Sequence, residues 1–586
     1  MNRYAAAVAA VIAVYVAASA LIYNQIDEDA YIYMRVADNL ALGHGYVFNP
    51  GDARIETGSA PLWQMLLLLG AVLTVDLTAW AKLLGVAFGI GCILLLYRLS
   101  RETLAERVSW FVPPAMLALS VPFVAWMQRG LESPLHVFTV LWLTLWLVRP
   151  PRPGAWVLPA VVLLLGRPEA PLLLLLILAP YLLARWREWR SAVVPLAVLV
   201  GTFSAMMLIR YLYFDDLVVS AYYVKPTELF RGQLGPALLA GVVPHALLIP
   251  FFVFLFWPRL WTGPCRVVAV SCGAMMLWSM LTAELYKPFF RHVIPALPFL
   301  FILACAAVEG VARRWRLPRR IWLAAAYAVL VGFVALQRQV ALNGRTFAPN
   351  PVHSNLGRFL DDPARFAAST AAKLHDPFAP TWSDDEATGG GIGTNYQALV
   401  GRFVKLNFPA GTTLLYDQMG QTPFFAGSDK RFIDTHGLTD RTVGWWRLCT
   451  TTGGATHGAM VRILAAARDV DAGRACQWET VASYLLASEP TAVLINRVAA
   501  PQAAHRLRID PRFQARFEMR YAIGPPNLPE LVVVFERRDS STRQPVVPAG
   551  LRLWTDPTPF RAPASSSTSM SAGSVVPKPI GHLRMP

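Results

Sequence analysis

Three carboxylates stand together directly after the first apolar stretch of the chain: Asp27, Glu28 and Asp29. At a water–lipid boundary, such crowded like charges raise one another's pKa. A carboxylate in that setting can accept a proton or bind a metal ion, whereas a solvated helix cap is the ordinary alternative for an isolated acidic run. We therefore take these three residues as candidate catalytic groups. Mg²⁺ or Mn²⁺ is a candidate cofactor, although no ligand spacing identifies a site.

Further ionisable residues recur in later loops between apolar stretches. They could be simple anchors, but ionisable groups at the ends of membrane spans mark functional sites by default. Cations at headgroup depth could bind a lipid-linked phosphate, and the candidates are Lys225, Arg291, His292 and Arg167. The candidates for binding the rest of a substrate are Arg35, His44, Glu56, Glu132, Glu169, Tyr222 and Glu284.

The composition indicates that most of the chain is not exposed to water. Of its 586 residues, 55% are hydrophobic and only 15% are charged, and the mean hydropathy is +0.42. The net charge of +16 is carried largely by short loops between apolar runs, which is typical of cytoplasmic loops. Zinc-finger spacing, a basic helix and an RNA-binding signature are all missing from the sequence, so a nucleic-acid partner is not expected.

Apolar runs near the length of a span predict a polytopic α-helical membrane protein with about 11 spans. Residues 4–23 form the first run and are interpreted as a retained signal anchor. The short basic loops predict a cytoplasmic N-terminus and an outer C-terminus. Residues 61–75 are apolar but short, and a span there would invert every later loop, so we expect an interfacial or re-entrant segment. The other candidate spans are 79–97, 108–127, 134–148, the hairpin 156–166 with 171–184, 192–210, 235–257, 266–283, 293–312 and 321–338.

The composition changes after the last apolar run and divides the chain into four parts. Residues 1–340 form the predicted membrane domain, with 24–60 as its first outer loop, and the polar segment 341–395 is a predicted linker. Residues 396–538 contain strand-like runs, such as 412–416, 492–495 and 531–535, between helix-like stretches, and they predict a compact extracytoplasmic α/β domain. Residues 539–586 are rich in Ser, Pro and Gly and predict a disordered tail. Cys449 and Cys476 could form a disulfide if this part lies outside the cytoplasm.

The order of the outer-loop motifs resembles that of the GT-C fold glycosyltransferases. The most similar group is that of the mycobacterial terminal β-(1→2) arabinofuranosyltransferase. The motifs that carry the resemblance are Asp29-Ala-Tyr, Gly43-His-Gly, Phe48-Asn-Pro-Gly, Glu56, Pro61-Leu-Trp, Gly130-Leu-Glu-Ser, Arg167-Pro-Glu, Arg210 to Lys225, and Asp434-Thr-His-Gly-Leu-Thr-Asp440.

The resemblance implies a GT-C membrane domain, a polyprenyl-phosphate sugar as donor and an active site on the periplasmic side of the plasma membrane. It also implies that Asp29 is the general base, supported by Glu28 and Asp27. The chain departs from the family pattern in two places. Glu28-Asp29 stands where the family has Asp-Asp, and Thr282-Ala-Glu-Leu-Tyr286 replaces Gly-Gly-Asp-x-Met, which leaves arabinose specificity open.

The expected function is that of a cell-envelope glycosyltransferase that moves a sugar, arabinofuranose included, onto an extracytoplasmic glycan, lipid or protein acceptor. Direct displacement of the lipid phosphate would invert the anomeric centre. The alternative is a lipid or sugar transporter or flippase. Transporters often show duplicated halves and place charges near the bilayer midplane, whereas this sequence shows no duplication and has its charges at the ends of the spans. A non-catalytic scaffold would leave the three first-loop carboxylates unexplained.

Overall fold

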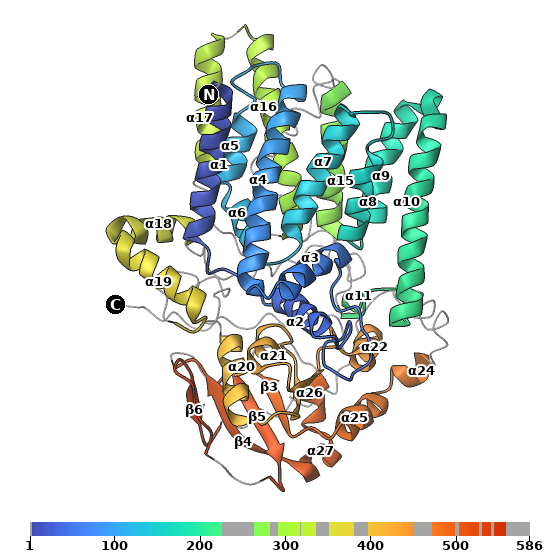
Figure 1. Ribbon diagram of the computed structural model, residues 1–586, viewed down its shortest axis with the longest axis vertical. Helices are drawn as coiled ribbons and strands as arrows, with labels where there is room; N and C mark the ends of the chain where they lie inside the picture. Colours follow the sequence, from blue (N-terminus) through green and yellow to red (C-terminus); the bar gives the residue numbers. More distant parts are fainter. Residues whose placement is uncertain are drawn as a thin grey trace, which may run out of the picture.

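Apolar helices and a mixed sheet occupy opposite ends of the molecule in the computed structural model (Figure 1). The first outer loop lies between them and contacts both. The structure describes residues 3–224, 263–281, 291–316, 318–335, 351–379, 396–450, 472–497, 503–526, 530–540 and 544–557.

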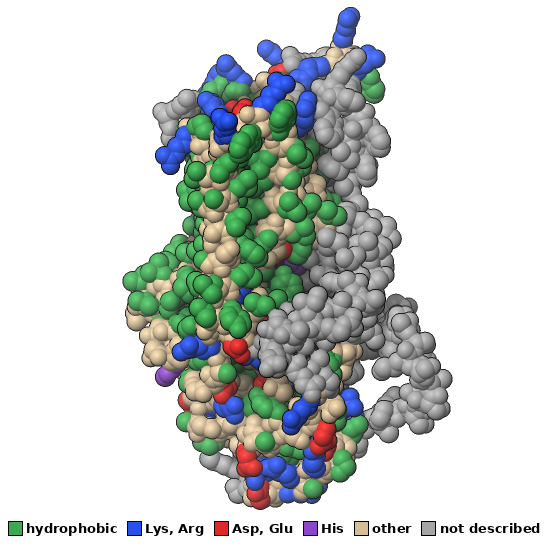
Figure 2. Space-filling model, turned by 90° about the vertical axis from the view of Figure 1, so that its right-hand side faces the viewer, with side chains coloured by type: hydrophobic (Ala, Val, Ile, Leu, Met, Phe, Trp, Pro, Cys, Tyr) green, Lys and Arg blue, Asp and Glu red, His purple; other side chains and the backbone are tan. Residues whose placement is uncertain are grey.

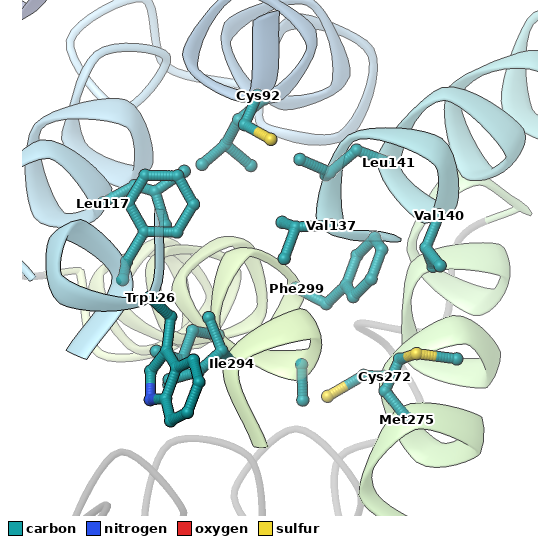
Figure 3. Packing of buried hydrophobic residues seen from close by; sticks show 14 of the residues in the cluster. Cys92, Leu117, Trp126, Val137, Val140, Leu141, Cys272, Met275, Ile294 and Phe299 are labelled. Atoms are coloured by element: carbon teal, nitrogen blue, oxygen red, sulfur yellow. The ribbon is translucent and has the colours of Figure 1, made fainter. Parts of the chain in front are cut away.

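The helical end is a bundle with one continuous apolar core. Buried side chains from several helices meet there, among them Cys92, Leu117, Val137 and Phe299 (Figure 3). The bundle helices are α1 (Arg3–Leu21), α4 (Leu77–Thr103), α5 (Val112–Leu119), α6 (Val121–Gln128), α7 (Ser133–Val148), α8 (Val157–Gly166), α9 (Ala170–Ala184), α10 (Trp189–Ile209), α15 (Gly263–Leu281), α16 (Leu297–Arg314) and α17 (Arg319–Ala335). The short helices η1 (Trp186–Glu188) and η4 (Arg291–Ala296) precede α10 and α16.

Several of the described helices can cross a membrane by length and composition. Four are continuous: Arg3–Leu21, Leu77–Thr103, Trp186–Phe214 and Arg291–Arg314. A fifth span results if α6 and α7, which meet at a bend of 119°, are taken as one broken span. Of the predicted runs, 235–257 lies outside the described residues, so the expected count of about 11 stays a prediction.

The surface charge follows the same axis. Figure 2 shows Lys and Arg gathered at the end of the bundle away from the sheet, an apolar band across the middle, and mixed charges around the sheet. The N-terminus lies at the basic end (Figure 1). The chain is therefore a membrane protein whose basic loops and sheet domain are on opposite sides of the apolar band.

Four shorter helices lie near the junction of the bundle and the sheet (Figure 1). They are α2 (Ala30–Ala41), α3 (Pro61–Val72), α18 (Pro351–Asp361) and α19 (Pro363–His375). With 12 residues, α3 is about 18 Å long, too short for a hydrocarbon core of about 30 Å.

The segment 341–395, predicted as a linker, contains the helices α18 and α19. Asn355 of α18 donates a hydrogen bond to the main-chain oxygen of Leu21 at 2.8 Å.

The sheet has six strands in the order β2-β1-β3-β5-β4-β6. Its first three strands are parallel to one another and the last three are joined antiparallel. The strands are β1 (Thr413–Tyr416), β2 (Arg431–Asp434), β3 (Ala492–Asn496), β4 (Phe517–Gly524), β5 (Val532–Arg537) and β6 (Arg552–Trp554). Because β6 pairs with β4, the sheet extends past the predicted domain boundary at residue 538.

Two apolar cores cover the two faces of the sheet. The first contains side chains of α20 (Tyr396–Asn407) together with Ile32 and Val36 of α2 and Phe48 of the first loop. The first loop is therefore part of the core of the sheet domain. The second core is formed with α22 (Arg441–Thr450), α25 (Trp478–Ala487), α26 (Ala503–Leu507) and α27 (Pro511–Arg516). The remaining short helices are α11 (Ala221–Val224), α21 (Gln421–Ala426) and α24 (Ala472–Ala475).

A disulfide joins Cys449, near the end of α22, to Cys476, which follows α24. The sequence left this pairing open. The bundle residues Cys92, Cys265, Cys272 and Cys305 are buried and form no disulfide.

Candidate functional site

The first carboxylate of the outer loop is directed into the bundle. Asp27 is buried, and its Oδ2 atom lies 3.7 Å from a guanidinium nitrogen of Arg129. Its Oδ1 atom accepts a hydrogen bond from the main-chain N–H of Asp29 at 3.1 Å. Asp29 itself stands half-buried at the N-terminal end of α2 and makes no side-chain capping bond to that helix. The contacts of Asp27 thus fix the turn that presents Asp29.

The second carboxylate points the other way, toward the sheet domain. Glu28 Oε1 accepts hydrogen bonds from the main-chain N–H groups of Gly420 (2.6 Å) and Gln421 (3.2 Å), at the start of α21. The two chains approach so closely here that a Cβ atom on residue 420 would overlap the main-chain oxygen of Glu28. Glycine at this position therefore permits the contact. Glu28 joins the first loop to the sheet domain.

Arg35 of α2 makes the same connection from the next turns of the loop. It is buried and uses all five of its N–H donors within the protein. The acceptors are the main-chain oxygens of Phe48, Pro423, Gly427 and Lys430 and the side-chain oxygen of Asn49. The prediction that Arg35 binds substrate is not tested by these contacts, but they give it a positioning role, because they hold α2 against the segment 423–430.

Four charged residues form a buried network at the outer end of the bundle. One carboxylate oxygen of Glu132 contacts the guanidinium groups of both Arg167 and Arg291. Arg167 also donates from Nε to Glu169 at 2.7 Å. The other oxygen of Glu132 has no hydrogen-bond partner among the described residues. Two arginines and two glutamates, far apart in sequence, therefore balance each other's charge in one place.

The turn before α7 explains how Glu132 reaches this network. Gly130 has a φ of +76°, which favours glycine, and the turn directs Glu132 and Ser133 toward η4. From η4, Arg291 donates to the Ser133 hydroxyl at 3.4 Å and its guanidinium lies 5.5 Å from the centre of the Trp126 ring. His292 lies close enough for its charge to act on Glu132.

A second buried ion pair lies beside this network. Arg210 binds both oxygens of Glu56, at 2.7 and 3.0 Å. It is the first residue of a π-helical turn, Arg210–Phe214, and such turns are frequent at functional sites. Burial raises the pKa of Tyr222 to about 12, and the negative charge of Glu169 adds to the shift. The charges of Arg167 and Arg210 both oppose that shift, so Tyr222 lies near both ion-pair groups.

The structure thus brings together part of the set of candidates from the sequence. Glu132, Arg167, Glu169 and Arg291 are joined by ion pairs, and Tyr222 lies near enough to Arg167 and Glu169 for their charges to act on it. His44, in contrast, is exposed at the end of α2. Lys225 and Glu284 lie outside the described residues.

Three cations near this region were not among the sequence candidates: Arg129, Arg210 and Lys82. Lys82 is buried, and its ammonium donates to the main-chain oxygens of Gln25 and of Gln128, the latter at 2.8 Å. The available signal was their position, since each is a charged residue at the outer end of an apolar run. Their partners could not be found from the sequence, because they are 46 to 154 residues away.

For metal binding, the described parts of the chain contain no group of three or more His, Cys, Asp or Glu side chains that could hold an ion. The described site itself offers carboxylates and guanidinium groups. Guanidinium groups at this depth suit a phosphate, and a carboxylate at the rim suits a proton acceptor.

The fold is that of the GT-C glycosyltransferase structures, an apolar helical bundle joined through a long loop to a domain with a mixed sheet. This confirms the fold predicted from the sequence. No protein-family model matches the chain, and no curated protein matches its sequence.

Among solved structures, the chain is similar to ArnT from Cupriavidus metallidurans bound to undecaprenyl phosphate. The identity is 12%, the TM-score is 0.51, and the match covers 93% of this chain and 99% of that one. The apo state of the same protein matches with 12% identity and a TM-score of 0.51, over 91% and 97% of the two chains. The arabinofuranosyltransferase AftD from Mycobacteria matches with 13% identity and a TM-score of 0.43, over 92% of this chain and 40% of that one.

Proposed function

We propose that this protein transfers a sugar from a polyprenyl-phosphate donor to an acceptor hydroxyl on the side of the membrane that carries the sheet domain. The observation that carries the proposal is the buried network in which Arg167 and Arg291 share one oxygen of Glu132. The resemblance of the fold to a protein bound to undecaprenyl phosphate supports it. Arabinofuranose remains a candidate sugar through the resemblance of the sequence motifs.

The two arginines suit a leaving phosphate for an electrostatic reason. Each is already held in place by a carboxylate, so little side-chain entropy is lost when an anion binds. A lipid phosphate would form ion pairs with Arg291 and Arg167, whose side chains are 11% and 9% exposed. In such a water-poor setting guanidinium–phosphate hydrogen bonds are strong.

Asp29 is the candidate base because its two neighbours are occupied in other ways. Asp27 is paired with Arg129, and Glu28 accepts two main-chain hydrogen bonds. These contacts give Asp27 and Glu28 the role of positioning the loop. In the reaction, the carboxylate of Asp29 would take the proton of the acceptor hydroxyl. The oxygen would then attack the anomeric carbon as its bond to the phosphate oxygen breaks.

The test is a transfer assay with purified protein in lipid nanodiscs. Radiolabelled decaprenyl- and undecaprenyl-phosphate sugars, with arabinofuranose among them, are supplied with a mixture of cell-envelope glycans. We expect transfer by the wild type, a kcat about 10³-fold lower for Asp29→Asn, and a raised KM for the donor in Arg291→Lys. The conservative lysine keeps the charge but not the bidentate geometry.

A matched control is Asp539→Asn, since Asp539 is an exposed carboxylate of the sheet domain. It should leave both constants unchanged. Transfer undiminished in Asp29→Asn would contradict the assignment of the base. Movement of labelled lipid across liposomes without any transfer would favour the transporter alternative.

The side of the membrane is part of the proposal. The basic end of the bundle suits the cytoplasm, and the Cys449–Cys476 disulfide suits an oxidising compartment. Reporter fusions at Arg101 and at Thr442 should therefore give opposite locations, with Thr442 outside. The same location for both would contradict the proposed topology.

A further inference from the structure

Buried polar groups without partners lie at the carboxyl ends of the parallel strands. Asp417 directly follows β1, is 6% exposed, and neither of its carboxylate oxygens has a hydrogen-bond partner among the described residues. Gln421, the first residue of α21, is fully buried, and neither polar atom of its side-chain amide has a hydrogen-bond partner in the described part of the chain. Leaving such atoms unpaired costs stability, so each one calls for an explanation.

Neighbouring strands place further polar groups beside Asp417. The N–H of Thr435, the residue after β2, bonds to the oxygen of Tyr416 at 2.8 Å, and the Thr435 hydroxyl is buried without a partner among the described residues. On the other side, Asn496 at the end of β3 donates to the Tyr396 hydroxyl at 3.0 Å. The negative charge of Asp417 acts on that tyrosine, so the two lie close together.

The strand order places Asp417 at a switch point of the sheet. From β1 the chain leads to β2 on one side, whereas β3 pairs with β1 on the other side. Adjacent parallel strands whose connections diverge in this way form a switch point, and ligands of α/β sheets bind outside the carboxyl ends of strands at such points. Asp417 and Asn496 stand at the ends of those two strands.

The same edge of the sheet faces the first loop. The turn that holds Asp417 and Gln421 is the one whose N–H groups bind Glu28, next to the candidate base Asp29. A molecule bound at this edge therefore lies beside the place where an acceptor hydroxyl must be activated.

The charges around the edge select the class of ligand. Asp434 is a further acid near Asp417, and the charges of Asp417 and Glu28 both act on Tyr396, so an anion would be repelled. No described set of three acidic, His or Cys side chains could hold a metal ion. Carboxylate, amide and hydroxyl groups together suit a neutral molecule with many hydroxyls, because each hydroxyl both donates and accepts.

We propose that Asp417, Gln421 and Thr435 form a binding site for a neutral glycan, which is the acceptor of the reaction. The proposal rests on the proposed transferase function for the identity of the ligand as acceptor. The hydroxyls of a sugar ring bond to Asp417 and to the Gln421 amide and hold the glycan so that a neighbouring ring reaches Asp29. The glycan is recognised by the sheet domain and modified at the membrane.

The test measures binding apart from transfer. Full-length protein in nanodiscs is titrated with neutral arabinan, galactan, mannan and glucan oligosaccharides, and with chitosan and sulfated oligosaccharides. We expect at least one neutral glycan to bind, at least tenfold weaker binding in Asp417→Ala and in Gln421→Ala, and no change in Asp539→Asn. Asp417→Asn should bind more weakly than wild type but better than Asp417→Ala.

The melting temperature serves as the control for folding. It should not fall in the Asp417 variants, because neither carboxylate oxygen of Asp417 has a hydrogen-bond partner among the described residues. The proposal is overturned if no neutral oligosaccharide binds, if binding is unchanged in Asp417→Ala, or if only sulfated or amine-bearing glycans bind. It is also overturned if Mg²⁺ or Mn²⁺ alone raises the melting temperature of wild type and not of Asp417→Ala.

The two proposals can fail separately. Asp29→Asn should bind the glycan as wild type does while it loses transfer. Glycan binding that depends on Asp417 in a protein without transferase activity would support the glycan-binding site and contradict the proposed transferase function. Transfer by Asp417→Ala with an unaltered KM for the acceptor would support the transferase function and contradict the glycan-binding site.

Discussion

The charged residues at the outer end of the bundle and those at the edge of the sheet are buried to a similar degree but differ in their partners. At the bundle, Glu132, Arg167 and Glu169 lie in one network, and Glu56 is bound by Arg210 through both oxygens. At the sheet edge, Asp417 and Gln421 have no side-chain hydrogen-bond partner among the described residues.

The difference indicates how each region would bind its ligand. Buried charges must be paired or their desolvation is not compensated, so the bundle presents arginines that are held in place and nearly neutralised before a phosphate arrives. A neutral ligand needs no such balance. The sheet edge can therefore leave polar atoms unpaired at a moderate cost in stability. The first loop contacts the bundle through Asp27 and the sheet domain through Glu28 and Arg35.

Breaking the bundle network should have the largest effect. Glu132→Ala removes the carboxylate that two buried guanidinium groups share, and leaves Arg167 and Arg291 less well paired. We expect a loss of about 3–5 kcal/mol in the free energy of unfolding, measured as a lower melting temperature in nanodiscs. The isosteric Glu132→Gln should lose less, and equal stability of wild type and Glu132→Ala would contradict the role given to the network.

Removal of the disulfide should have the next largest effect. Replacing Cys449 and Cys476 by serine releases a loop of 27 residues, for which chain entropy predicts a loss of about 3 kcal/mol. The loss should be confined to the sheet domain, as amide hydrogen exchange can show. A reducing agent should reproduce it in the wild type and have no effect on the variant, and insensitivity of the wild type would contradict the pairing.

Much of the fold could be predicted from the sequence, because its signals are local. The apolar runs gave the bundle, and the strand-like run Ala492–Ile495 corresponds to β3. The predicted run 412–416 likewise corresponds to β1. The strand β6 was not predicted, since three residues in a stretch rich in Ser, Pro and Gly form a strand only because β4 offers an edge.

The site was less accessible to prediction because its contacts are distant in sequence. The acidic first loop was found, but Arg35 binds acceptors 388 to 395 residues away and Glu28 binds N–H groups 392 and 393 residues away. Asp417 was missed for a related reason. A single Asp after a strand is common in turns, and only the packing around it shows that it is buried without a partner.

A third change tests the cost of that unpaired group. Burial raises the pKa of Asp417 to about 7, the neighbouring Gln418 side chain offsets part of the shift, and the charge of Asp434 adds to it. The folded protein thus holds this proton more tightly than the unfolded chain, in which the pKa is about 3.9. Wild-type stability should therefore be lower above pH 7 than near pH 4, as far as this group is concerned.

Asp417→Asn should remove this cost. We expect a gain of about 2 kcal/mol above pH 7 that shrinks as the pH falls toward 4, measured by urea unfolding of the sheet domain monitored by hydrogen exchange. Glu28, Asp434 and Tyr396 are the titratable neighbours and remain in both proteins, so the difference between the two proteins isolates residue 417. A loss of stability in the variant would show that Asp417 is stabilised by contacts other than those described here.

The smallest effect should come from Glu28→Gln, and it separates the two regions most sharply. The amide oxygen of glutamine can still accept the N–H groups of Gly420 and Gln421, but without the charge that strengthens those bonds. We expect a loss of about 1 kcal/mol in stability and only a few-fold lower kcat, against about 10³-fold for Asp29→Asn. If Glu28 were the base, kcat would fall more in Glu28→Gln than in Asp29→Asn, while the loss of stability in Glu28→Gln would remain as expected. A kcat that falls only in proportion to the loosened contact between loop and sheet would show that this glutamate acts by positioning its neighbour.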